Sequence, residues 1–159
     1  MPSYVVRLGS FFGIIACLLG VTPAPSATPT PDATNTTYVA PSFDHPRKVV
    51  MSLSERDPRR ANEVIDNVDN VQKYYGVDDV EIALVVYGAG INAVIKENSK
   101  VAGRIAGLIA DGVQVMACAN TLAHVHKTAA DLLPGVSVVP SGLPKIIELQ
   151  AQGWYYVRP

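Results

Sequence analysis

The residue with the clearest chemical potential in this sequence is Cys118, which follows an apolar run over residues 113–117 and precedes Asn120 and Thr121. If that run is a buried strand and Thr121 opens a helix, the thiol lies at the carboxyl end of the strand and faces a helix N-terminus. Ligands bind at this edge of open α/β sheets, and a helix N-terminus favours a thiolate over a thiol. The alternative is a core cysteine, because free cysteine is among the most buried residue types. The position alone favours neither interpretation.

A second candidate loop follows the apolar residues 80–87, where two glycines are separated by one alanine. Glycine lets the backbone approach a ligand closely, or it simply makes a tight turn. Loops that follow parallel strands meet at one edge of the sheet, and residues 140–142 are expected there as well. The predicted site therefore has Cys118 as the catalytic thiol and, as substrate-binding residues, Tyr87, Gly88, Gly90, Asn120 and Thr121. Neither a dinucleotide fingerprint nor a P-loop is present in the sequence, so we expect no cofactor.

Histidines close to the thiol raise the question of a metal site made by Cys118, His124 and His126. Residues two apart on a helix point roughly 200° from each other, so the two imidazoles would not face one ion. We therefore expect no metal, and His124 remains only a candidate base for the thiol. Glu55 and Arg56, in the loop after the first predicted strand, either line the same edge or make surface contacts.

The elements that must position these residues alternate between strands and helices. Apolar runs predict strands at residues 47–53, 80–87, 113–118, 136–139 and 154–157. Helical spacing and capping signals predict helices at residues 58–75, from about 100 to 111, at 121–133 and at 143–152. Such alternation is typical of βαβ units with a mainly parallel sheet. The predicted fold class is therefore α/β, as a single flavodoxin-like three-layer domain with a mainly parallel five-stranded sheet, over residues 47–159.

The residues before this domain are typical of an export signal and a linker. Arg7 and the apolar residues 8–21 predict a signal peptide over residues 1–27, with cleavage after Ala27. A lipobox ending at Cys17 is the competing interpretation and predicts a membrane-anchored lipoprotein, and an uncleaved anchor is a third. Residues 28–46 are rich in Pro, Thr and Ala and predict a disordered tether. We therefore expect a periplasmic or extracellular protein. The net charge of −1 gives no electrostatic argument for binding nucleic acid or a membrane surface.

The domain resembles the DsrE/DsrF-like family of sulfur-relay proteins. The matching segments are KVVMSL, IALVVYGAGI, GVQVMACANTL, a VPSG turn and the terminal GWYYV. The resemblance implies a DsrE-like fold, assembly into homotrimers or homohexamers, and a Cys118 that accepts sulfane sulfur as a persulfide. The partners it implies are a sulfane-sulfur donor and an acceptor thiol or protein. Two departures stand out: Tyr87 replaces a histidine that many relatives carry, and the relay proteins are cytoplasmic whereas this chain has a predicted export signal.

Three functional hypotheses follow. The first is a sulfurtransferase-like carrier that holds a persulfide on Cys118 and passes the sulfur to an acceptor. The alternative is a non-catalytic exported module that binds a small ligand or assembles with other chains, with Cys118 merely packed. The third is a redox switch through intermolecular Cys118 disulfides, which would suit an oxidising compartment. Reactivity of the thiol at neutral pH discriminates between the first two.

Overall fold

The computed structural model describes residues 38–159 of the chain. The predicted signal peptide, the Cys17 lipobox and residues 28–37 of the predicted tether lie outside the described residues. Within residues 38–46, Ser42 and His45 exchange two backbone hydrogen bonds of 3.2 and 3.0 Å, which close a turn just before the first strand. None of the helices in the described part of the chain combines the length and the apolar character needed to cross a bilayer.

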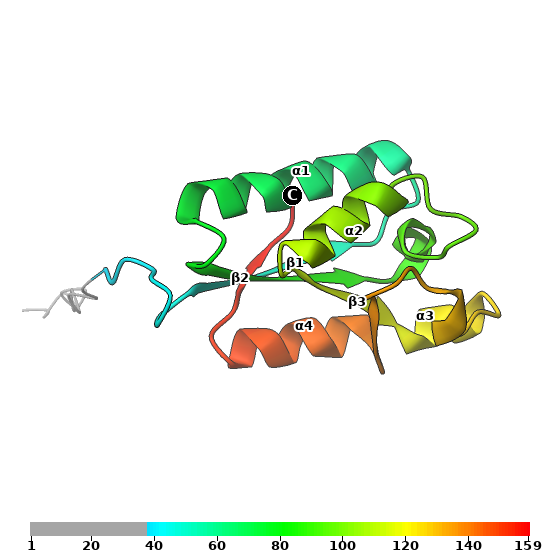
Figure 1. Cartoon of the computed structure of the whole chain (residues 1–159). Helices are drawn as coiled ribbons and strands as arrows, with labels where there is room; N and C mark the ends of the chain where they lie inside the picture. Colours follow the sequence, from blue (N-terminus) through cyan, green and yellow to red (C-terminus); the bar gives the residue numbers. More distant parts are fainter. Residues whose placement is uncertain (1–37) are drawn as a thin grey trace, which may run out of the picture. The chain divides into compact units, whose positions relative to one another are not determined.

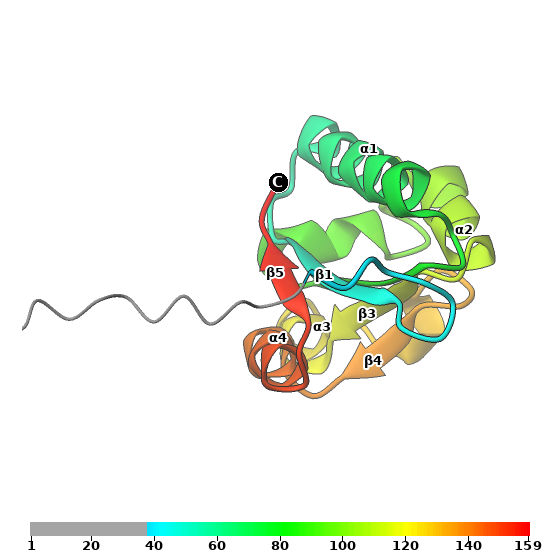
Figure 2. The ribbon, with the colours of Figure 1, turned by 90° about the vertical axis from the view of Figure 1, so that its left-hand side faces the viewer.

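The centre of the domain is one parallel sheet of five strands in the order β4-β3-β2-β1-β5. The strands are β1 (Arg47–Leu53), β2 (Val80–Val86), β3 (Gln114–Cys118), β4 (Ser137–Val139) and β5 (Tyr155–Val157). β2 is covered on both faces, since Ile82 to Val86 are all buried, which explains its continuous apolar sequence. All strands run in the same direction, so their carboxyl ends share one edge (Figures 1 and 2).

Helices on both sides of the sheet complete the three layers (Figure 1). They are α1 (Pro58–Tyr75), α2 (Ala102–Ala110), α3 (Ala119–His124) and α4 (Gly142–Ala151), with the 3₁₀ helices η1 (Gly88–Ala93) and η2 (Ala129–Asp131). α1 and α2 bury Val68 and Ile105 in the larger core on one face. α4 buries Ile146 and Leu149 in a smaller core on the other, together with Trp154. This arrangement confirms the predicted α/β layer domain.

The first helix begins and ends where the sequence predicts. The Asp57 side chain caps it by accepting a hydrogen bond of 2.9 Å from the Arg59 N–H, and Pro58 occupies the first turn. Gly76, with a φ of 98°, ends it. On its outer side, Arg104 of α2 donates hydrogen bonds to three residues of α1, namely Asn62, Asp66 and Asp69. α1 and α2 are thereby fixed to each other as one layer.

The helix predicted at residues 121–133 is wrong in its extent. α3 begins two residues earlier and ends at His124, after only six residues. His126 adopts a φ of 56°, and the N–H groups of His126 and Lys127 bond back to the carbonyls of Ala123 and Leu122. This is the hydrogen-bond pattern that ends a helix through a left-handed residue, usually a glycine. Because histidine takes the glycine position here, the sequence carried no obvious stop signal.

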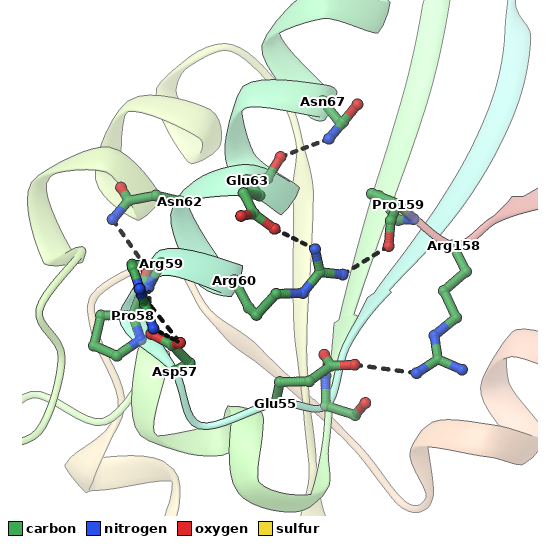
Figure 3. Close-up of polar contacts among 11 residues, drawn as sticks. Glu55, Asp57, Pro58, Arg59, Arg60, Asn62, Glu63, Asn67, Arg158 and Pro159 are labelled. Atoms are coloured by element: carbon green, nitrogen blue, oxygen red, sulfur yellow. Dashed lines mark hydrogen bonds and ion pairs between the residues drawn. The ribbon is translucent and has the colours of Figure 1, made fainter.

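The last strand and the tail after it are tied to the loop that follows β1. The Ser52 and Tyr156 hydroxyls lie 2.9 Å apart, and Arg158 makes an ion pair of 3.1 Å with Glu55. Figure 3 shows this pair beside Arg60, which donates a hydrogen bond of 2.8 Å to the Pro159 carbonyl and also pairs with Glu63. The tail therefore lies at the carboxyl edge of the sheet, where the candidate site is.

Candidate thiol site

Cys118 occupies the position that the sequence predicts, at the carboxyl end of a central strand. It is the last residue of β3 and the N-cap of α3, so its backbone turns directly from strand to helix. Its side chain points to the α4 side of the sheet, as does that of Met116 two residues earlier. The residue is only 4% exposed. The thiol is therefore enclosed, although it lies at an edge.

Polar donors surround the thiol. Burial by itself raises the pKa of Cys118, because it disfavours the charged thiolate. Nearby hydrogen-bond donors act in the opposite direction: the Thr121 hydroxyl and the backbone N–H groups of Thr121, Gly142 and Asn120 lower the pKa. The net result is a pKa below the ordinary value of 9.0. The site thus stabilises an anionic sulfur inside the protein, which is the form that acts as a nucleophile.

The donors come from two separate parts of the chain. Asn120 and Thr121 belong to the first turn of α3, whereas Gly142 is the first residue of α4. The Thr121 hydroxyl oxygen also accepts a hydrogen bond of 3.1 Å from the Gly88 N–H, in the loop after β2. Thr121 therefore links the glycine loop to the thiol, and the structure brings together Cys118, Gly88, Asn120 and Thr121 as predicted.

Gly90 has a packing function in this structure. Its N–H bonds to the Ser54 carbonyl at 2.9 Å and to the Tyr87 carbonyl at 3.1 Å. A Cβ atom at this position would lie 2.4 Å from the Leu53 carbonyl oxygen, far inside van der Waals contact. The sequence suggested either a close approach to a ligand or a tight turn, whereas the structure shows Gly90 in close contact with the backbone of Leu53. It presses the loop after β2 against the end of β1.

Tyr87 packs against the start of α4, next to Gly142. Its side chain is half-buried and packs against the smaller core. A Cβ atom at Gly142 would lie 3.0 Å from the Tyr87 Cβ and 3.2 Å from its Cδ1, so the ring rests on the start of α4. Residues 140–142 were predicted at this edge, but no pattern in the sequence indicated Gly142 as a donor near the sulfur. The Ser-Gly pair before a helix was the only available signal.

An open hollow of about 600 Å³ lies beside the first turn of α3, with Asn120 and Thr121 in its wall, and Cys118 itself does not line it. The wall also includes Arg56, Asn92 and His124. Arg56 does line this edge, which was one of its two predicted roles, whereas Glu55 pairs with Arg158. His124 reaches the hollow, yet the structure records no hydrogen bond between it and the thiol within residues 38–159. In that same part of the chain no three His, Cys, Asp or Glu side chains are grouped as metal ligands would be.

The fold and the site together define an α/β layer domain of flavodoxin-like layout, with a buried, hydrogen-bonded thiol at the carboxyl edge of its parallel sheet. The chain belongs to the DsrE/DsrF-like family, whose sequence model matches residues 49–159. Membership in this family suggests a sulfur-relay type of role.

Two solved structures are similar to this chain. A protein of unknown function from Methanobacterium thermoautotrophicum, MTH1491, shares 36% identity over 71% of this chain and 99% of its own, with a TM-score of 0.68. The YchN protein from E. coli matches over the same shares with a TM-score of 0.59 but only 12% identity, so it is similar in fold alone. No curated protein matches the chain.

Proposed function

We propose that the protein is a sulfur carrier that takes up sulfane sulfur as a persulfide on Cys118 and passes it to an acceptor thiol or protein. In the uptake step the Cys118 thiolate attacks the outer sulfur of a donor. A new S–S bond forms, the bond between the donor's two sulfurs breaks, and the leaving group departs with the electron pair. An acceptor thiolate then attacks the terminal sulfur and releases the Cys118 thiolate again.

The observation that carries this proposal is the set of four donors around the Cys118 sulfur. Burial raises the thiol pKa, but the Thr121 hydroxyl and the N–H groups of Asn120, Thr121 and Gly142 lower it by more. A cysteine that merely fills space in an apolar core has its pKa raised instead. The same donors suit the terminal sulfur of a persulfide, which is also anionic, so both states of the carrier would be stabilised.

The second candidate function is an exported binding or assembly module in which Cys118 is inert. The observation in its favour is the burial of Cys118, which is only 4% exposed. A donor reaches such a sulfur only if Thr121 or Tyr87 moves aside or if the donor is small. The two functions therefore differ in whether the thiol reacts at all with small reagents in water.

We further propose assembly into a homotrimer or homohexamer and action outside the cytoplasm. Leu143 and Ile147 support assembly, because they lie one turn apart on α4 and are 57% and 64% exposed. A single-subunit mass in sedimentation experiments would rule this assembly out. Export rests on the sequence of residues 1–27 alone, and finding the protein only in the cytoplasm of its host would refute it.

The test of the carrier function is the intact mass of the full chain after exposure to thiosulfate, polysulfide or glutathione persulfide. Because the chain has two cysteines, Cys17 and Cys118, the experiment uses a Cys17→Ser background. We expect a gain of sulfur that dithiothreitol reverses and that Cys118→Ser abolishes. No gain with any donor, together with a thiol that resists alkylation, would refute the carrier function and favour the binding module.

A further inference from the structure

We propose that the hollow beside Thr121 binds a small anion that carries sulfane sulfur, such as thiosulfate, through Arg56, Asn120 and His124, and presents its outer sulfur to Cys118. This inference rests on the proposed carrier function and names its class of donor. The hollow is about 600 Å³, the size of a small-molecule site.

The three side chains have hydrogen-bonding capacity to spare. Arg56, Asn120 and His124 are all exposed. Within residues 38–159 their side chains take part in no hydrogen bond or ion pair. Asn120 and His124 lie four residues apart on α3 and therefore on the same face of the helix. Arg56 reaches the hollow from a different element, the loop after β1. Three donors thus converge on one space from two sides.

The charge around the hollow favours an anion. Its wall contains an arginine, a histidine, two asparagines and a threonine, and no carboxylate. The two acidic residues that flank Arg56 in the sequence are already paired, Glu55 with Arg158 and Asp57 with Arg59. The Arg56 guanidinium is consequently not neutralised by its neighbours. A guanidinium binds the oxygens of an oxyanion through paired N–H groups, and such charge-assisted hydrogen bonds are among the strongest in proteins.

The position of the hollow fits transfer to the thiol. Asn120 and Thr121 line the hollow and lie in the first turn of α3, whose N-cap is Cys118, so a bound anion lies within one helical turn of the residue that carries the nucleophile. With thiosulfate, the Cys118 thiolate attacks the outer sulfur, an S–S bond forms to it, and its bond to the sulfonate sulfur breaks. Sulfite leaves with that electron pair, so the step needs neither an oxidant nor a reductant.

The first test compares two alkylating reagents of nearly equal size, anionic iodoacetate and neutral iodoacetamide, on the full chain with Cys17→Ser. The ratio of their rates reports the attraction of an anion to the site and is independent of the thiolate fraction. We expect Arg56→Gln to lower this ratio about tenfold, as the loss of a charge-assisted hydrogen bond implies. Arg56→Lys, which keeps the positive charge, should lower the ratio less than Arg56→Gln does. Lys73→Gln, which removes an exposed positive charge in the last turn of α1 and outside the hollow, is the matched control and should leave the ratio unchanged.

The second test measures thiosulfate binding by calorimetry to the Cys118→Ser variant, which holds the site without the nucleophile. Binding that weakens about tenfold or more in Cys118→Ser/Arg56→Gln supports the anion site, even if no donor ever loads the thiol and the carrier function fails. The inference is overturned if Cys118 takes up sulfur from anionic donors but Arg56→Gln changes neither the ratio of the iodoacetate and iodoacetamide rates nor the dependence of sulfur uptake on donor concentration. Arg56-dependent loading from glutathione persulfide, with none from thiosulfate, would support the site and identify a larger anionic donor.

Discussion

Replacing Thr121 by valine should raise the pKa of the Cys118 thiol, because the variant lacks the hydroxyl donor that lowers this pKa. A hydrogen bond to a charged group contributes about 1.5–3 kcal/mol, and the lower figure corresponds to about a tenfold change in the thiol–thiolate equilibrium. The backbone donors of Asn120, Thr121 and Gly142 remain. We therefore expect about tenfold less thiolate at pH values below the midpoint. Gly88 loses its acceptor as well, but it is exposed, so water can replace the hydroxyl.

The assay is the rate of alkylation by iodoacetamide across a pH series, on the full chain with Cys17→Ser. The midpoint of the pH profile reports the thiol pKa, whereas the plateau reports access to a residue that is 4% exposed. Intrinsic nucleophilicity, which rises with thiol pKa, alters the plateau rather than the midpoint. Separating these two quantities prevents slow access from being mistaken for a raised pKa.

Thr121→Ser is the matched control, because serine keeps the hydroxyl and loses only a methyl group. It should retain most of the wild-type midpoint, while Thr121→Val shifts it to higher pH. An unchanged midpoint in Thr121→Val would show that the hydroxyl does not stabilise the thiolate. Equal shifts in both variants would show that the methyl contact matters and the hydrogen bond does not. Either result would refute the electrostatic reasoning behind the carrier proposal.

Two further predictions concern stability. Gly90→Ala forces a Cβ against the Leu53 carbonyl and should lower the free energy of unfolding by about 1–3 kcal/mol in urea titrations, whereas Gly103→Ala, in open space on α2, should raise it by about 0.5–1 kcal/mol. Because the pKa of Cys118 is lowered in the folded state, its contribution to stability is complete above 9.0 and is lost as pH falls through the native pKa. The stability of wild type relative to Cys118→Ser should therefore rise with pH, and a constant difference in denaturation experiments would contradict the lowered pKa.

Most of the framework was predictable from local patterns. Asp57 and Pro58 indicate the start of α1, and Gly76 indicates its end. The continuous apolar run of β2 indicates a strand buried on both faces. These signals are local because capping and burial act over a few residues. The end of α3 was missed since it depends on His126 in a left-handed conformation that sequence patterns associate with glycine.

The site was only partly predictable. The common location of Cys118, Gly88, Asn120 and Thr121 was predictable, because their elements share one edge of the sheet. Gly142 was missed as a donor, since it is separated by 24 positions from the thiol and no pattern in the sequence links the two. The sequence also did not predict that the Arg56 guanidinium has no ion-pair partner within residues 38–159. This depends on Glu55 pairing with Arg158, which is distant in the sequence.

The contact between Gly90 and Leu53 has a consequence for how this site can be redesigned. The contact is between backbone atoms, so no choice of side chain can loosen it. Two backbone hydrogen bonds also join the ends of β1 and β2, from the Tyr87 N–H to the Leu53 carbonyl and from the Gly90 N–H to the Ser54 carbonyl. New specificity is therefore hard to introduce at residues 88–90. The segment from His124 to Asp131 faces no such constraint, since it is built from short turns and largely exposed side chains. Libraries that vary this segment should yield altered ligand preference with fewer unfolded variants.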